Sequence, residues 1–364
     1  MSQAPSIGPY RLRGRVLLAP MAGITDAPFR RLCRQWGASL ATSEMTTADV
    51  SLWHSAKSVR RLAIDDDLSP RVVQIAGSEP EAMAQAAKLA VDRGAEIIDI
   101  NMGCPAKKVC RRLAGSALLR DEGLVQRILD AVVNAVDVPV TLKMRTGWSP
   151  DRRNGPRIAR IAQQSGISAL AVHGRTRACH YRGSAEYETI REIKLAVDIP
   201  VFANGDVLNP LMAEQVLKET RADGVMIGRG ARGRPWMLQQ IHDYLERKIL
   251  TPGPTLRIQR ATIIDHLENT YRFYGEQTGV RVARKHLAWF TEPMVDGAAF
   301  RRSVMQAQDT RSQMQITNEF LTRRVAGENT DAHGQSPPVS ATWRRPAEPN
   351  QLPERPTAKP RLPA

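Results

Sequence analysis

Cysteine and long apolar runs are both scarce in this 364-residue chain. The four cysteines form no CxxC pair, and they are too few for a disulfide framework. No stretch approaches the roughly 20 apolar residues of a membrane span, and the first 15 residues lack the apolar core of a secretory signal. These absences argue against a disulfide-rich, zinc-bound or membrane protein. We therefore expect a cytoplasmic enzyme.

Acidic residues are also in short supply, 37 against 52 lysines and arginines, so the net charge is +15. From residue 247 onward, 18 basic and 11 acidic residues give +7 over 118 positions, whereas the first 246 positions carry +8. The charge density of the last third is thus nearly doubled. Such an excess favours a polyanionic partner through Coulomb attraction and counterion release. A general arginine bias of the proteome is the alternative explanation of the charge alone.

Eight short apolar segments alternate with amphipathic helical patterns up to about residue 250. Nearly apolar strands separated by helices indicate a parallel sheet covered on its outer face. Eight such repeats predict an α/β fold of the (β/α)8 TIM-barrel type over residues 1–250. In one helix, over 79–93, Ser78 is expected to cap and Pro80 to sit in the first turn. The expected strands are 16–21, 40–45, 72–76, 97–102, 138–144, 169–173, 201–203 and 224–227.

The pattern changes after Thr251-Pro252-Gly253-Pro254, a sequence typical of a linker. Helical spacing over 258–274, 281–290 and 298–321 predicts a small all-α module at 251–325. Residues 326–364 contain eight prolines and few aliphatic residues, which indicates a disordered tail.

Two late glycine-bearing loops predict a phosphate site. In a parallel barrel, catalytic groups lie at the C-terminal strand ends, and the loops after strands seven and eight often bind phosphate. Here those loops are Asn204-Gly205-Asp206 and Gly228-Arg229-Gly230. Glycine lets the backbone approach a phosphate, and Arg229 adds a charged guanidinium group that can bind it through two hydrogen bonds. Each tripeptide alone is a weak signal, but together they favour a phosphorylated cofactor.

Three further strand-end residues are compatible with a flavin. Lys143 could stabilise the anionic reduced ring, and the amide of Gln74 could both donate to and accept from the ring edge. His173 could contact the cofactor or its phosphate. The alternative for Lys143 is a strand-end lysine whose ammonium group reaches solvent. The alternative for His173 is a core histidine whose hydrogen bonds are made within the protein.

Cys104 is the leading candidate for a catalytic residue. It lies directly after a strand in Gly103-Cys104-Pro105, on a basic loop. A lone cysteine is usually a small buried hydrophobe. On such a loop a thiol can donate a proton, because nearby cations tune its pKa. Cys110 on the same loop is the rival, and Cys33 and Cys179 are given no role. The basic residues of the loop are Lys107, Lys108, Arg111 and Arg112.

A series of ordered motifs along the chain resembles those of the tRNA-dihydrouridine synthases. Loop residues such as 107–110 and 115–119 look closest to the bacterial B-type enzymes. The resemblance covers about residues 15–321 and ends in the helical module with His286-Leu287-Ala288-Trp289-Phe290. The other motifs are 19–26 (APMAGITD), 101–105 (NMGCP), 143–145 (KMR), 173–176 (HGRT), 204–206 (NGD) and 226–230 (MIGRG).

The resemblance implies a cofactor, a substrate and a set of roles. NADPH or NADH would reduce FMN, which would then pass a hydride from N5 to C6 of a uridine in the D loop of tRNA. Cys104 would protonate C5 from the opposite side, and Asn101 and Arg145 would face the target base. The expected partner is tRNA, with no membrane, no obligate protein partner and a monomeric state. The implied FMN-binding residues are Pro20, Met21, Ala22, Gln74, Lys143, His173, Asn204, Gly205, Asp206, Gly228 and Arg229.

A uridine inside folded tRNA must be extruded to reach a barrel mouth, which predicts a basic track across the helical module. Trp289 and Phe290 are expected in its core. Two other functions stay open. An FMN barrel acting on a free pyrimidine, like a dihydroorotate dehydrogenase, leaves the basic module unexplained, and a non-catalytic RNA-binding protein leaves the mouth residues without purpose. The track candidates are Arg281, Arg284, Lys285, Arg301 and Arg302.

Overall fold

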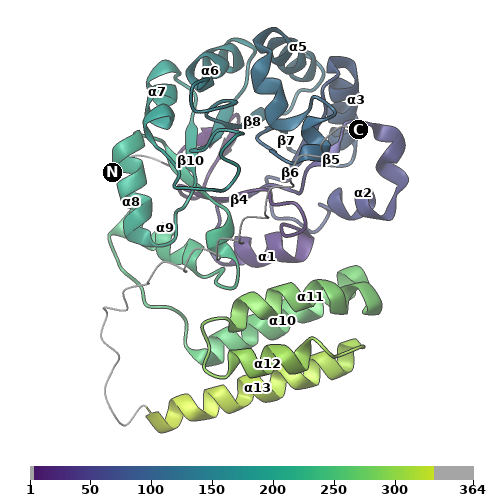
Figure 1. The fold of residues 1–364 in the computed structure, drawn as a ribbon, viewed down its shortest axis with the longest axis vertical. Coiled ribbons are helices and arrows are strands. Elements are labelled where there is room, and N and C mark those ends of the chain that lie inside the picture. The colour runs from purple at the N-terminus through teal and green to yellow at the C-terminus, as the bar shows by residue number, and fades with distance from the viewer. Residues whose placement is uncertain (1–3, 332–364) are drawn as a thin grey trace, which may run out of the picture.

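The first domain is a closed ring of parallel strands surrounded by helices (Figure 1) in the computed structural model, which describes residues 4–331. The sheet order is β4-β3-β11-β10-β9-β8-β7-β6-β5, and every neighbouring pair is parallel. The strands are β3 (Val16–Leu18), β4 (Leu40–Ala41), β5 (Thr46–Thr47), β6 (Val72–Ala76), β7 (Ile97–Met102), β8 (Val140–Arg145), β9 (Ala169–His173), β10 (Val201–Asn204) and β11 (Gly224–Ile227).

The two ends of this sheet, β4 and β5, are pieces of one chain segment. β4 pairs with β3, β5 pairs with β6, and Thr42 between them bridges Val72. The ring therefore closes through residues 40–47. This confirms the predicted eight-stranded barrel, with the second expected strand split in two.

Amphipathic helices cover the outer face of the barrel in chain order. In α3, for example, Met83, Ala86, Ala87 and Ala90 form a buried stripe. Pro80 lies in its first turn as expected, but the hydroxyl of Ser78 donates to the Arg112 carbonyl (3.0 Å) and caps nothing. The helices are α1 (Ala27–Gln35), α2 (Ala56–Arg61), α3 (Pro80–Asp92), α4 (Lys107–Cys110), α5 (Glu122–Val133), α6 (Gly155–Gln164), α7 (Glu188–Ala196), α8 (Pro210–Thr220) and α9 (Met237–Arg247), with 3-10 turns η1 (Val50–His54), η2 (Gly115–Arg120) and η3 (Arg229–Ala231).

The barrel interior changes from apolar to polar along the strands. Residues such as Leu17, Leu40 and Val72 form an apolar layer near the strand starts. A strand turns alternate side chains to the same face, so the inward positions further along carry polar groups. A short hairpin, β1 (Ser6–Ile7) and β2 (Tyr10–Arg11), brings Ile7 against the apolar layer and closes that end. The sequence did not predict this hairpin, because two-residue strands show no periodicity.

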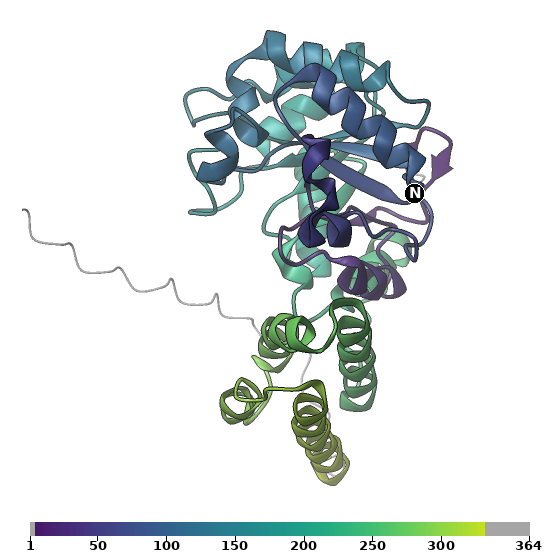
Figure 2. The ribbon, with the colours of Figure 1, turned by 90° about the vertical axis from the view of Figure 1, so that its right-hand side faces the viewer.

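Four helices form a second lobe beside the barrel (Figure 2). They are α10 (Leu256–Tyr274), α11 (Glu276–Thr291), α12 (Gly297–Val304) and α13 (Thr310–Asp331). The single helix expected over 298–321 is therefore wrong. Asp309 accepts hydrogen bonds from the amide and hydroxyl of Ser312, which starts a new helix there. α13 runs past residue 325, and the part of the expected tail from residue 332 onward lies outside the described residues.

The helical module is fastened to the barrel at the start of α1. The Tyr274 hydroxyl donates to Asp26 (2.9 Å), whose other oxygen caps α1 at Phe29, and Lys285 donates to the Gly23 carbonyl. The ring of Phe29 lies 5.4 Å from that of His286. The module thus sits on the β3–α1 side of the barrel. No helix within residues 4–331 has both the length and the apolar character to cross a membrane.

Candidate active site at the barrel mouth

Lys143 is a buried cation in the polar layer. Its ammonium group donates to the side-chain oxygen of Asn204 (3.1 Å), and the Asn204 amide is in turn fixed by the Met226 carbonyl (2.7 Å). Burial, assisted by the charge of Arg145, lowers the pKa of Lys143 to about 8. A buried cation that is hydrogen-bonded to a neutral amide has charge left to offer an anionic ligand.

Gln74 is held by a network from neighbouring strands. Its amide nitrogen donates to Asp99 (2.6 Å), and its oxygen accepts from Asn101 (2.8 Å). Thr141 donates to the other oxygen of Asp99 (2.6 Å), and burial raises the pKa of Asp99 to about 6. Asp99 and Thr141 were not anticipated. The available signal was a carboxylate two residues before Asn101 in a buried strand, which places both on the inner face.

The loop that carries Cys104 is fixed on both sides. The side-chain oxygen of Asn101 accepts from the amides of Gly103 and Cys104, and the Cys104 carbonyl accepts from the amide and hydroxyl of Ser116. Gly115 has φ +62°, and a Cβ there would lie 2.8 Å from the Cys104 carbonyl oxygen. This close approach excludes a side chain at position 115 and holds the backbone of Cys104, whose thiol is half-buried.

Burial raises the pKa of the Cys104 thiol, and the cations that oppose this shift are Arg145 and Lys143. The cations that act on the thiol thus come from β8, whereas the prediction had relied on the basic residues of the loop. The thiol is therefore a protonated acid at neutral pH. Cys110, the rival, lies with its sulfur 3.7 Å from the Cys104 carbonyl oxygen.

Arg145 ties two loops together. It is 1% exposed, and its Nε donates to the Gly103 carbonyl (2.8 Å). Its Nη1 donates to the carbonyls of Thr176 and His180, at 2.9 and 2.8 Å. Asn101 and Arg145 both lie at the mouth, and both are engaged with the backbone of the loops that frame it. Contact with a target base stays a prediction for each.

Asp206 joins the two predicted phosphate loops, and it also binds Arg175, to which the sequence had assigned no role of its own. The Arg175 guanidinium forms two hydrogen bonds with the Asp206 carboxylate, at 3.1 and 2.6 Å, and Arg229 lies 3.5 Å from the same carboxylate. Burial acts to raise the pKa of Asp206, but hydrogen bonds from Arg175 and the Ala185 amide outweigh it and lower the pKa. Asp206 therefore stays ionised and anchors the loop after β9.

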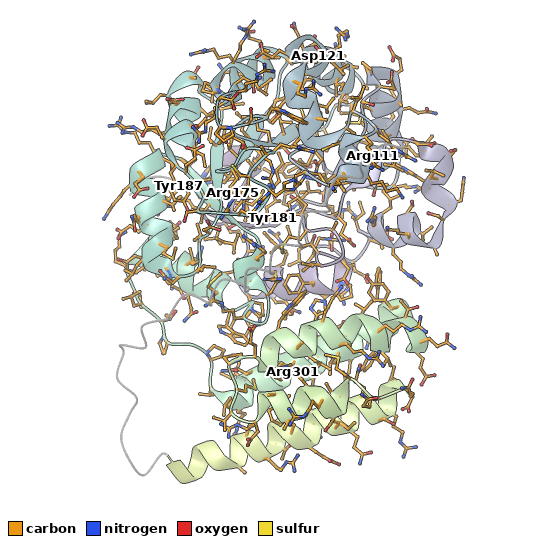
Figure 3. The ribbon with its side chains drawn as sticks, viewed as in Figure 1. Arg111, Asp121, Arg175, Tyr181, Tyr187 and Arg301 are labelled. Carbon is orange, nitrogen blue, oxygen red and sulfur yellow. The ribbon has the colours of Figure 1, made fainter. Side chains whose placement is uncertain are left out.

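His173 lies among these cations and is held neutral. Burial, together with the charges of Lys143, Arg145, Arg175 and Arg229, keeps its pKa well below the ordinary value. Tyr181, another residue that the sequence did not single out, has its ring 6.1 Å from that of His173 and lies under Arg145 and Arg229. In Figure 3, Arg175 and Tyr181 lie within the ring of helices.

The mouth fits an anionic flavin in three respects. Four cations converge on His173. A Cβ on Gly228 would meet nothing closer than the Met21 sulfur at 3.7 Å, so the backbone there is open to a ligand. Met21 belongs to the loop after β3, together with Pro20 and Ala22. The donor set, a buried lysine, an oriented amide and glycine-bearing loops, suits a ring system that carries a phosphate.

Comparison with known proteins identifies the family. A family model described as "Dihydrouridine synthase (Dus)" matches residues 17–326. The chain is 55% identical to tRNA-dihydrouridine synthase B of Xanthomonas campestris over 88% of its length and 97% of the relative's. It is 54% identical to the Pseudomonas aeruginosa protein of that name, covering 87% and 96% of the two chains, and 51% identical to the Escherichia coli one, covering 86% and 98%. The chain belongs to the dihydrouridine synthase family, as its ordered motifs indicated.

Proposed function

We propose that this protein reduces the C5=C6 bond of a uridine in the D loop of tRNA to 5,6-dihydrouridine, with bound FMN and with NADPH or NADH as reductant. One observation carries the proposal most directly: a half-buried thiol, on a loop held by Asn101 and Ser116, lies at the mouth that also contains the buried cation Lys143. The names of the relatives, tRNA-dihydrouridine synthase B, support the choice of substrate.

When bound, FMN would supply the hydride for the reaction. Lys143 would balance negative charge on the flavin, and Gln74, oriented by Asp99, would hydrogen-bond its edge. The backbone of the loops at Gly205 and Gly228, with Arg229, would bind the phosphate. His173 would contact the cofactor as a neutral imidazole, while Asp206 would act by holding Arg175 and Arg229 in place.

Cys104 would deliver a proton from its sulfur to C5 of the base, so that hydride and proton together saturate the double bond. The thiolate left behind would be stabilised by Arg145 and Lys143, the two cations that already act on its pKa. Because Asn101 and Arg145 hold the backbone at residues 103 and 104, they would also fix the distance between base and thiol.

The helical module is proposed to bind tRNA through its exposed arginines. Arg281 and Arg302 lie on its surface. By contrast, Arg284 donates to the Ala307 carbonyl, Lys285 to Gly23 and Arg301 to Thr291, so these three candidates of the basic track hold the fold. We expect the protein to act as a monomer in the cytoplasm.

The test uses the full chain loaded with FMN and tRNA purified from cells without dihydrouridine synthases. Incubation with NADPH, or separately with NADH, is followed by nuclease digestion and mass spectrometry of the fragments. A mass gain of about 2 Da on one D-loop uridine is the expected result. Reduction of free uracil or uridine without RNA would favour the free-pyrimidine alternative. RNA binding by a protein that takes up no flavin would favour the non-catalytic one.

A further inference from the structure

A second basic feature lies on the barrel itself, away from the helical module. It is a hollow of about 370 Å³ between the end of η2 and the loop 146–154 that follows β8. We call it the Trp148 hollow. Its lining includes Arg120, Trp148, Arg152, Arg153 and Asn154.

The indole of Trp148 holds two guanidinium groups. The Cζ atom of Arg120 lies 5.0 Å from the ring centroid, and that of Arg177 lies 4.6 Å from it. Stacking on an indole face restricts a guanidinium while leaving its N–H donors free to bind a ligand. The ring therefore reduces the entropy that each arginine loses on binding a phosphate.

Most of the acidic charge near the hollow is already engaged. Glu122 is paired with Arg157 (2.5 Å) and accepts from Asn154, and Glu186 lies 3.7 Å from Arg153. Asp151, which also lines the hollow, accepts a hydrogen bond from Ser149, and the charge of Arg152 contributes to lowering its pKa. Within residues 4–331, no carboxylate lies within ion-pair distance of Arg120 or Arg152. The lining, with three arginines (Arg120, Arg152 and Arg153) and two carboxylates (Glu122 and Asp151), therefore keeps a net positive charge.

The hollow and the helical module lie on opposite sides of the barrel. In the closed ring β8 is the strand opposite β3, and the module is fastened to the loop after β3. Figure 3 shows this separation: Asp121, next to Arg120, lies at the far edge of the barrel from Arg301 of the module, with Tyr181 between them. Because the segments after β7 and β8 form the hollow, it opens on the same face as Cys104.

We propose that the Trp148 hollow binds the sugar–phosphate backbone of the substrate RNA, so that the RNA spans the mouth and is held on both sides of it. The inference deepens the proposed function and rests on it for the identity of the substrate as RNA. Arg120 and Arg152 would each contact a phosphate. Gripping the RNA on both sides of the mouth would position the extruded base over Cys104.

The experiment compares the full-length FMN-loaded protein with the double variant Arg120→Ala/Arg152→Ala. The expected result is a rise of about tenfold or more in KM for tRNA, with kcat within about twofold. Without reductant, the slope of log binding constant against log salt should become less steep by about 1.5, which corresponds to two lost phosphate contacts. FMN uptake should be unchanged, which shows that the barrel is folded.

Arg93→Ala is the matched control. Arg93 is also exposed and also stacks on a tryptophan, 5.2 Å from the ring centroid of Trp53, but it lies at the end of α3, on the face away from the mouth. This variant should leave both KM and the salt slope unchanged. Trp148→Leu keeps both arginine charges, so it should raise KM by a smaller factor and preserve the slope.

Unchanged KM and unchanged salt slope in the Arg120→Ala/Arg152→Ala variant would overturn the inference while leaving the proposed function intact. A loss of kcat with normal tRNA binding would also overturn it, because the residues would then act on the chemical step. If the unmodified protein made no dihydrouridine, the proposed function would fail. The salt slope of tRNA binding would still decide whether the hollow holds RNA.

Discussion

Lys143 and Cys104 have pKa values displaced in opposite directions by the same cause. Burial disfavours the charged form of either group, so it lowers the pKa of the lysine to about 8 and raises that of the thiol. The lysine is thereby close to losing its charge unless an anion binds, whereas the thiol keeps its proton. Both effects suit a site that binds an anionic cofactor and donates a proton.

Cys104→Ala should lower dihydrouridine formation by about a hundredfold or more, since loss of a general acid costs about 10²–10⁴ in rate. FMN binding and tRNA affinity should stay within about twofold, because the backbone hydrogen bonds of the loop come from Asn101 and Ser116. Single-turnover assays and flavin fluorescence measure the two effects separately. Cys110→Ala is the control and should keep its rate. A slow Cys110 variant beside a normal Cys104 variant would reverse the assignment.

The affinity for FMN should fall as pH rises through about 8. Free protein loses the Lys143 charge above this pKa, so the anion then binds only after proton uptake, at a cost of up to tenfold in affinity per pH unit. Flavin fluorescence titrations between pH 7 and 9.5 measure the effect. Lys143→Arg stays charged over this range, so its affinity for FMN should depend little on pH. Lys143→Met has no charge to lose, so it should bind FMN weakly and also with little pH dependence. Equal slopes for all three proteins would show that Lys143 does not carry the dependence.

At the scale of elements, the loops of the mouth are ordered by a few long-range contacts. Arg145 joins the Cys104 loop to the loop after β9, and Arg175 joins that loop to the one after β10. Loops have few buried apolar contacts of their own, so such hydrogen bonds largely decide their conformation.

Asp206→Ala should release the loop at residues 174–187. It removes two charged hydrogen bonds and leaves the buried Arg175 with only neutral partners, two carbonyls and the His173 ring, which should lower the free energy of unfolding by about 2 kcal/mol. Trypsin should then cleave at Arg177 or Arg182 about tenfold faster, and FMN affinity should fall. The exposed Asp198, which contacts Gln163, provides the control Asp198→Ala, with no change in cleavage. Unaltered proteolysis of the Asp206 variant would mean that other contacts hold the loop.

Because the pKa of Asp206 is lowered in the folded protein, its contribution to stability changes with pH in a defined direction. A carboxylate whose pKa is lower in the folded state stabilises the fold above its unfolded pKa, and this contribution is lost as the pH falls through the folded value. The stabilisation by Asp206 is therefore present at neutral pH and absent in strong acid.

For the whole molecule, the seam between barrel and helical module contains a buried histidine pair. The rings of His266 and His286 lie 4.7 Å apart, next to Phe29 of α1. Among the described residues, none is a hydrogen-bond partner for their ring nitrogens. Burial lowers the pKa of His266 to about 3, and that of His286 lies well below its ordinary value for the same reason.

The stability of the protein should therefore fall as the pH drops below about 6.5. Both histidines stay neutral in the folded protein but bind protons on unfolding, so each costs about 1.4 kcal/mol per pH unit below that value. Urea unfolding between pH 4.5 and 7 measures the slope. His266→Phe should reduce the slope by about half of the pair's contribution, whatever it does to stability at pH 7. His54→Phe, at an exposed position, should leave it unchanged. A His266 variant with the original slope would contradict this account.

The sequence by itself determined the barrel, the order of its strands and several of the residues at its mouth. Strand periodicity and strand-to-helix alternation are local properties, and the C-terminal ends of parallel strands must share one face. Hence Gln74, Lys143 and Asn204 could be placed together before any coordinates. Local signals failed where elements are short: the hairpin at Ser6–Ile7 and the break before Thr310.

Only the tertiary structure decided the contacts between residues far apart in the chain. Tyr274 and Asp26 are separated by 248 positions, and Arg175 reaches Asp206 across 31. Which polar groups meet depends on how loops from different strands close over the mouth, and no periodicity encodes that. For this reason only the folded molecule showed that Arg145 and Arg175 anchor the loops of the mouth. The same holds for the hydrogen bond from Lys285 to the barrel and for the two arginines stacked on Trp148.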